Sequence, residues 1–190
     1  MKKLFLLTLL PWFFLNQSCG TSYDESEVKN YTLYGVEVPA DAQKEFKYLV
    51  SVFNKKTGFE VLRWVDTPSD ANSPVILTAG LDERDGKVGW GQWMSETEQE
   101  NQFNNVNVFS KPKRTTQYSM RLELDKEYVT SRLGGNEAKR YELMKLFFHE
   151  IGHGLQMDHD PDPKAVMYYD ISGNKDFDKY FEGVRAYFAQ

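Results

Sequence analysis

The spacing of hydrophobic residues predicts three helices. In residues 39–58, apolar side chains stand at positions i, i+3, i+4 and i+7 counted from Phe46, which is the pattern of one helix face packed on a core. Residues 141–151 are apolar on most sides, as is typical of a buried helix. Residues 176–188 again carry a single apolar stripe. We therefore expect two amphipathic helices and one buried helix between them.

Shorter apolar runs predict strands between the first helix and the buried one. The predicted strands are 59–65, 74–78, 106–109 and 118–124. A glycine-rich stretch with Trp90 and Trp93 lies among them, and we expect both tryptophans in the core. A polar loop is predicted over 95–105. Helix, strands, buried helix, loop and final helix is the order of an α+β domain.

The N-terminus predicts export. Lys2 and Lys3 precede an apolar run over residues 4–15 that is too short to span a bilayer, which indicates a signal peptide over 1–18. Cys19 follows it directly and resembles the acylated cysteine of a bacterial lipoprotein. We expect a protein of the cell envelope or cell surface, held at the membrane by this lipid alone. The alternative is ordinary secretion with one free thiol.

Residues 19–38 are rich in Asp, Glu, Ser and Tyr, and predict a tether with a short strand at its end. Residues 39–190 then suffice for one hydrophobic core and form the predicted folded domain. The formal net charge of −5 gives no sign of nucleic-acid binding. A single cysteine excludes a disulfide within the chain.

All three histidines of the chain lie within residues 149–159. His149 and His153 stand four residues apart, so on a helix both imidazoles point from the same face and can bind one metal ion. Glu150 follows the first histidine and can reach the remaining coordination position, where water binds. Two imidazoles, a carboxylate base and a third ligand are the parts of a zinc hydrolase site.

His159 is the leading third ligand. A straight helix would carry it about 9 Å past His153 along the axis, so the helix must end and the chain must turn back. Gly154 follows the second ligand, and prolines occur soon after His159. Asp160, or Glu182 on the final helix, is an alternative third ligand.

Residues 149–160 resemble the extended zinc motif of the metzincin metallopeptidases, H-E-x-x-H-x-x-G-x-x-H-(D). The run Ala165-Val-Met167-Tyr resembles the Met-turn that lies beneath the zinc in that clan, in wording closest to the matrix metalloproteinases. Asp160 after the third histidine is more like the adamalysins. The resemblance implies a twisted mixed sheet, a backing helix, a zinc-site helix and a C-terminal helix. It also implies one catalytic zinc ion, and structural calcium without an assignable site.

Gln156 and Tyr169 stand at two positions where members of the metzincin clan carry particular residues. Gln156 stands where metzincins carry glycine, at a turn that tends to need a positive φ. Tyr169 stands two residues after Met167, where astacins and serralysins place a tyrosine that binds zinc or stabilises the oxyanion. The plain alternative for Tyr169 is a core or surface aromatic.

The leading hypothesis is a zinc endopeptidase, in which Glu150 is the general base for a water that the metal activates. Its partner is then a protein or peptide substrate, which by resemblance binds along an edge strand near 89–94 or 106–109. The alternatives are a lipid-anchored binding protein with a structural zinc site, or a zinc hydrolase of a non-peptide amide. Neither the substrate nor the oligomeric state can be inferred from the sequence.

Overall fold

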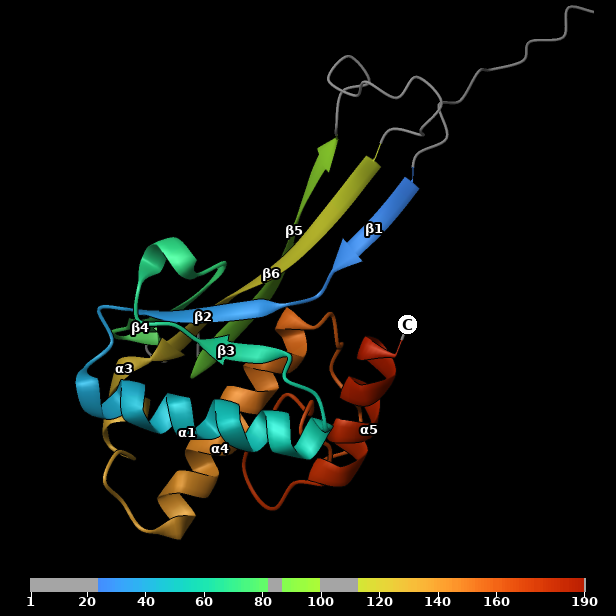
Figure 1. Ribbon diagram of the computed structural model, residues 1–190. Helices are drawn as coiled ribbons and strands as arrows, with labels where there is room; N and C mark the ends of the chain where they lie inside the picture. The colour runs from blue at the N-terminus through green and yellow to red at the C-terminus, as the bar shows by residue number, and fades with distance from the viewer. Residues whose placement is uncertain (1–23, 82–86, 100–112, 190) are drawn as a thin grey trace, which may run out of the picture.

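The computed structural model describes residues 24–81, 87–99 and 113–189 (Figure 1). It contains a six-stranded mixed sheet with the order β1-β6-β4-β2-β3, in which β5 pairs with β6. The strands are β1 (Asp24–Val28), β2 (Tyr31–Val36), β3 (Leu62–Trp64), β4 (Ser73–Thr78), β5 (Gly89–Gln99) and β6 (Lys113–Asp125). All pairs are parallel except β5 with β6.

Three long helices lie on one side of the sheet (Figure 1). They are α1 (Ala40–Thr57), α4 (Glu137–Gly154) and α5 (Phe177–Phe188), and a short helix α3 (Lys126–Thr130) follows β6. Helix α1 ends at Gly58, whose φ of 80° is the left-handed conformation that glycine adopts readily. Asn136 caps α4 by accepting a hydrogen bond from the Lys139 N–H. The predicted α+β fold with three long helices is confirmed.

Aromatic side chains fill the core between the three helices. Phe148 of α4 packs on Phe53 of α1 and on Tyr180 and Phe181 of α5, with ring centroids 5.5 to 6.3 Å apart. Phe148 comes directly before His149 in the chain. These aromatic contacts therefore fix the helix turn that carries the first histidine.

Strand β6 organises the sheet because it has neighbours on both edges. On one edge it pairs with β1 through residues 113–117 and with β4 through residues 122–125. On its other edge it pairs with β5 over the whole length of that strand. The paired strands β1, β5 and β6 extend as an arm beyond the helices (Figure 1). In the described part of the chain, β5 has one strand partner and so a free outer edge.

The structure differs from the sequence-based expectation at several places. Strand β5 runs to Gln99, so the loop predicted over 95–105 is wrong for its first residues. Trp90 and Trp93 are 41% and 44% exposed, so the prediction that they lie in the core is wrong. The tether predicted over 19–38 is expected to carry one short strand at its end, whereas two strands, β1 and β2, lie within residues 24–36. The strand predicted over 106–109 lies outside the described residues. In the described residues, every helix is too short or too polar to cross a bilayer.

Candidate metal centre

Helix α4 carries His149 and His153 and ends one residue after the second of them. The chain turns back because the Met157 N–H donates to the Gly152 carbonyl oxygen at 2.9 Å, which closes the C-terminal turn. This turn requires left-handed backbone at Gln156, whose φ is 63°. Gln156 thus keeps the positive φ that this turn tends to need in metzincins, although it is not a glycine. A non-glycine residue in this conformation costs roughly 1–2 kcal/mol.

The reversal of the chain brings the three imidazoles together. The Nε2 atom of His153 lies 3.2 Å from Nε2 of His149 and 3.2 Å from Nε2 of His159. The ligand atoms of all three lie within 4.8 Å of one another. Nitrogens bound to one tetrahedral zinc ion at 2.0–2.1 Å stand about 3.3 Å apart. The donor set and its spacing therefore fit a zinc ion bound by three histidines.

Backbone carbonyls fix which nitrogen of each helical histidine faces the metal. The Nδ1 atom of His149 lies 2.8 Å from the Val166 carbonyl oxygen, and Nδ1 of His153 lies 3.0 Å from that of Met157. A carbonyl oxygen only accepts, so Nδ1 carries the proton and donates it, and Nε2 keeps its lone pair. Such outer partners orient metal-binding histidines in many proteins.

Burial keeps the helical histidines neutral. It lowers the pKa of His149 to about 4, and the nearby His153 and His159 add to the effect. Burial also lowers the pKa of His153, with a further contribution from His159. At neutral pH both imidazoles are thus unprotonated at Nε2 before a metal arrives, as binding requires.

The segment 165–168 packs directly beneath the two helical ligands. Met167 is 3% exposed, and a Cβ atom on Gly152 would lie 2.2 Å from its sulfur. Gly152 lies between the two ligands in the sequence, so its missing side chain makes room for this methionine. The Tyr168 N–H donates to the Ala165 carbonyl oxygen at 3.2 Å, which closes the turn. Met167 therefore lies where the resemblance to a Met-turn places it.

Glu150 is buried on the opposite side of the histidine pair, beneath strand β5. It is 4% exposed, and its Oε2 atom has no hydrogen-bond partner. Burial raises its pKa to about 8, although a hydrogen bond from the Gly91 N–H and the charge of Lys87 act in the opposite direction. A buried carboxylate with an unpaired oxygen, next to a metal site, is a candidate proton acceptor.

Two glycines on β5 allow this strand to pass close to Glu150. A Cβ atom on Gly89 would lie 2.4 Å from Oε1 of Glu150, and one on Gly91 would lie 2.1 Å from the Glu150 carbonyl oxygen. Both distances are far below van der Waals contact. Sequence analysis did not single out either residue, although a G-x-G spacing in a strand places both glycines on one face.

We expect Gly91→Ala to lower kcat by about 100-fold, because the methyl group meets backbone and β5 must move away from α4. A displacement of about 1 Å at a catalytic site can cost about this much. The measurement is kcat on one peptide substrate, with zinc content determined in parallel. Gly183→Ala is the control, since Gly183 is exposed on α5 and a methyl there meets only the flexible end of Met157. Full activity in Gly91→Ala would show that β5 tolerates the shift.

The other candidate ligands do not join the histidine cluster. The Asp160 carboxylate forms an ion pair with Lys179 at 2.9 Å. Glu182 lies exposed on α5. Within the described residues, the three histidines form the one group of at least three metal-binding side chains. Tyr169 is 71% exposed, and its hydroxyl oxygen accepts a hydrogen bond from Tyr168 at 2.9 Å. Cys19 lies outside the described residues.

A cleft of about 700 Å³ opens over the histidines. Residues 87–91, which lead into and begin β5, line one wall, and residues 169–171 line another. Leu146, Glu150 and the three histidines also line it. The structure thus brings Tyr169, Glu150 and the histidines, all named from the sequence, to one cleft.

A comparison with protein families supports the same conclusion. The family model for matrixin (peptidase M10) matches residues 82–181, which is more than half of the chain. The match spans β5, β6, the histidine helix and the Met167 turn. A comparison with curated proteins found no match. The match and the geometry of the histidines together show a zinc-dependent endopeptidase domain, and the chain belongs to the matrixin family of metzincin peptidases.

Proposed function

We propose that Glu150 is the general base of this zinc endopeptidase and that Tyr169 assists at the same cleft. The observation that carries the role of Glu150 is its buried Oε2 atom, which has no partner and lies in a cleft shared with the three histidines. A nearby zinc ion favours the ionised form of this group, and a carboxylate held there without a structural partner is then available to accept a proton. Burying this oxygen without a hydrogen-bond partner costs free energy, and no structural contact of the atom offsets that cost.

The histidines would hold the ion through Nε2, and the Val166 and Met157 carbonyls hold the rings in place. When bound, zinc lowers the pKa of a water molecule towards about 7 and polarises the carbonyl of the scissile peptide. Glu150 takes the proton of the attacking water and passes it to the leaving amine. The Tyr169 hydroxyl, which is exposed at the cleft wall, would donate a hydrogen bond to the oxyanion.

Strand β5 supplies the docking edge for an extended peptide. Its inner edge is taken by β6, while its outer edge is free of strands in the described part of the chain. The segment 87–91, which includes the first residues of β5, lines the cleft. A peptide that adds to this edge as a further strand would pass over Glu150 and the histidines.

Matrixin membership argues against the alternative of a binding protein with a structural zinc site. A structural site would be closed by a fourth protein ligand. Asp160 is the nearest candidate in sequence, and its carboxylate is bound to Lys179. Hydrolysis of a non-peptide amide has no observation in its favour.

We also propose that residues 1–18 are a signal peptide and that Cys19 is acylated, so that the domain is anchored at the cell surface. The support is the charged and apolar leader directly before the chain's single cysteine. The folded domain then begins before residue 39, because Tyr31 and Leu33 of β2 are fully buried.

Expression of the whole chain in a bacterium should place it in the detergent phase of a Triton X-114 partition. Cys19→Ser should move it to the aqueous phase, and an unchanged partition would contradict acylation.

The activity is tested by incubating a proteome-derived peptide library with the zinc-loaded domain and reading the products by mass spectrometry. We expect internal cuts that disappear when zinc is chelated and return when it is restored. Cuts confined to chain ends would instead indicate an exopeptidase. No cuts by a folded, zinc-loaded domain would contradict the proposed function.

A further inference from the structure

Two lysines of the described chain are buried, which is rare for this residue type. The side chain of Lys145 on α4 is fully buried, and Lys175 is 9% exposed. An ammonium group removed from water must be compensated by acceptors. Both lysines donate to backbone carbonyls of the segment 163–175, which contains the Met167 turn and one wall of the cleft.

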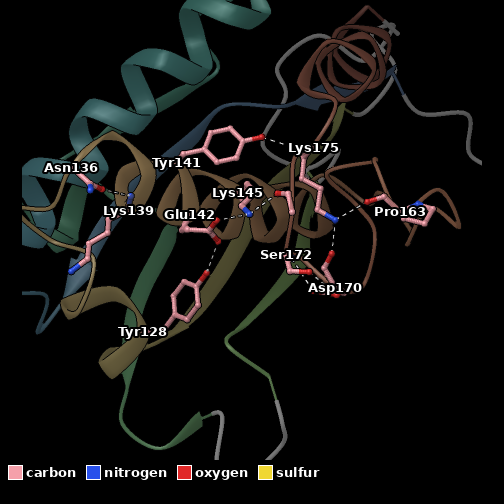
Figure 2. Close-up of polar contacts among 11 residues, drawn as sticks. Tyr128, Asn136, Lys139, Tyr141, Glu142, Lys145, Pro163, Asp170, Ser172 and Lys175 are labelled. Carbon is pink, nitrogen blue, oxygen red and sulfur yellow. Dashed lines mark hydrogen bonds and ion pairs between the residues drawn. The ribbon is translucent and has the colours of Figure 1, made fainter.

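Lys175 closes this segment on itself (Figure 2). Its Nζ atom donates to the Pro163 carbonyl oxygen at 2.9 Å and to the carbonyl oxygen of Asp170. It also lies 5.1 Å from the centre of the Tyr168 ring. One ammonium therefore bridges the start of the segment and its cleft wall, in the way a bound cation gathers the carbonyls of a loop.

Lys145 attaches the same segment to the metal-site helix. Its Nζ atom donates to the Gly173 carbonyl oxygen at 2.8 Å and pairs with the Glu142 carboxylate at 2.8 Å (Figure 2). Lys145 stands one helical turn before His149, so the two side chains leave α4 from the same face. The Lys175 N–H adds a further link to α4 by donating to the Tyr141 hydroxyl at 3.0 Å.

The two ends of the segment have different anchors. Val166 and Met167 are held by the metal site itself, through the His149 ring and the space at Gly152. The stretch that lines the cleft, residues 169–171, follows them and is bridged by Lys175 at Asp170. Lys145 holds the chain shortly after it, at Gly173. Loss of an ammonium should therefore loosen the wall and leave the histidines in place.

We propose that Lys145 and Lys175 are positioning residues that fix the cleft wall 169–171 and so determine how tightly the enzyme binds and discriminates substrate side chains. The proposal rests on the proposed function in one respect, namely that this cleft receives the substrate. Neither lysine is named by the zinc motif. Their action is on the position of the wall, and so on substrate binding and on the oxyanion contact proposed for Tyr169, and not on the zinc site or on Glu150.

The test uses the zinc-loaded domain with Lys175→Met and Lys145→Met, because methionine is a linear side chain without the ammonium. Hydrogen exchange of residues 165–173 should become about tenfold faster, with zinc content unchanged. For a set of peptides that differ in one side chain beside the cut, KM should rise by about tenfold and the spread of kcat/KM should narrow, while kcat should fall by no more than it does in Tyr169→Phe.

Lys164→Met is the matched control, because Lys164 lies in the same segment and is exposed. It should leave exchange, KM and substrate preference unchanged. If a buried variant does not fold, Glu142→Gln replaces it, since it removes the carboxylate partner of Lys145 and keeps the ammonium. That variant should also make hydrogen exchange around Gly173 faster, by a smaller factor than the lysine variants do.

Unchanged exchange and KM in folded Lys175→Met would overturn the proposal, as would a loss of zinc that accounts for all of the change. The failure of the proposed function looks different. In that case the wild-type domain would cut no peptide, while the exchange rates of the variants would still report whether the two lysines hold the wall.

Discussion

Replacing Glu150 by glutamine is expected to lower kcat by about 10²–10⁴-fold while zinc stays bound at one ion per chain. Glutamine has the same shape but cannot accept a proton, and a positioned general base contributes a factor of this size. The histidine rings are held by the carbonyls of Val166 and Met157, so the metal site does not depend on residue 150. The measurement is kcat on a peptide from the library, with zinc determined by atomic absorption. A variant that kept more than about a tenth of the wild-type kcat would remove Glu150 from the base role.

The same variant gives a second readout that needs no substrate. In the metal-free protein, burial raises the pKa of Glu150 to about 8, so this group is largely protonated at pH 7. Burial lowers the pKa of His149 to about 4, so that ring is already neutral at pH 7 and releases no proton when it binds zinc. A nearby dication favours the carboxylate form. Zinc binding at pH 7 should therefore release about one proton more from the wild type than from Glu150→Gln.

The extra proton is released only where Glu150 is protonated before zinc binds and ionised afterwards. At a pH well above 8, the metal-free wild type has already lost the Glu150 proton, so the difference between the two proteins should vanish. Titration calorimetry in buffers of different ionisation enthalpy measures the number of protons released. Equal release at pH 7 would mean that Glu150 does not sense the metal.

Replacing His159 by alanine is expected to weaken zinc binding by at least about 100-fold and to abolish cleavage at low zinc. Removing a residue that only hydrogen-bonds a metal ligand already lowers metal affinity by about 10–100-fold, and removing a direct ligand lowers it more. Its Nε2 atom lies 3.2 Å from that of His153, at the spacing of two ligands on one ion. Competition with a chromogenic chelator measures the affinity in each variant.

Asp160→Ala separates this ligand assignment from its main rival. Asp160 is bound to Lys179, and we expect its loss to change zinc affinity by less than about threefold. Strong loss in Asp160→Ala together with a mild effect in His159→Ala would reverse the assignment. Comparable loss in both would indicate that the turn, rather than one ligand, governs the site.

The metal site could be anticipated from the sequence because its determinants are local. A four-residue helical spacing and a chain reversal within residues 149–159 fix which side chains can meet. The metzincin pattern marks position 156 as a turn that tends to need a positive φ, and Gln156 adopts one. These inferences need only covalent geometry over a short stretch of chain.

Features that depend on contacts distant in sequence could not be anticipated in this way. Gly89 and Gly91 matter because β5 happens to cross α4 at Glu150, about sixty residues further along the chain. By residue type the two tryptophans of β5 are expected in the core, whereas Trp90 and Trp93 are 41% and 44% exposed. Lys145 reads as a polar interruption of an apolar helix until Gly173 is seen beside it.

The placement of β1 bears on how the protein could be kept inactive. Strand β1 pairs with the edge of β6 that faces away from β5, so Glu25 and Glu27 run along the side of the arm opposite the substrate edge. An inhibitory propeptide must reach the metal, and this segment does not do so while it remains paired. The protein could therefore be immobilised or fused through its N-terminal side without obstructing the entrance for substrate. Any latency that acts through residues 24–28 would first require their release from β6.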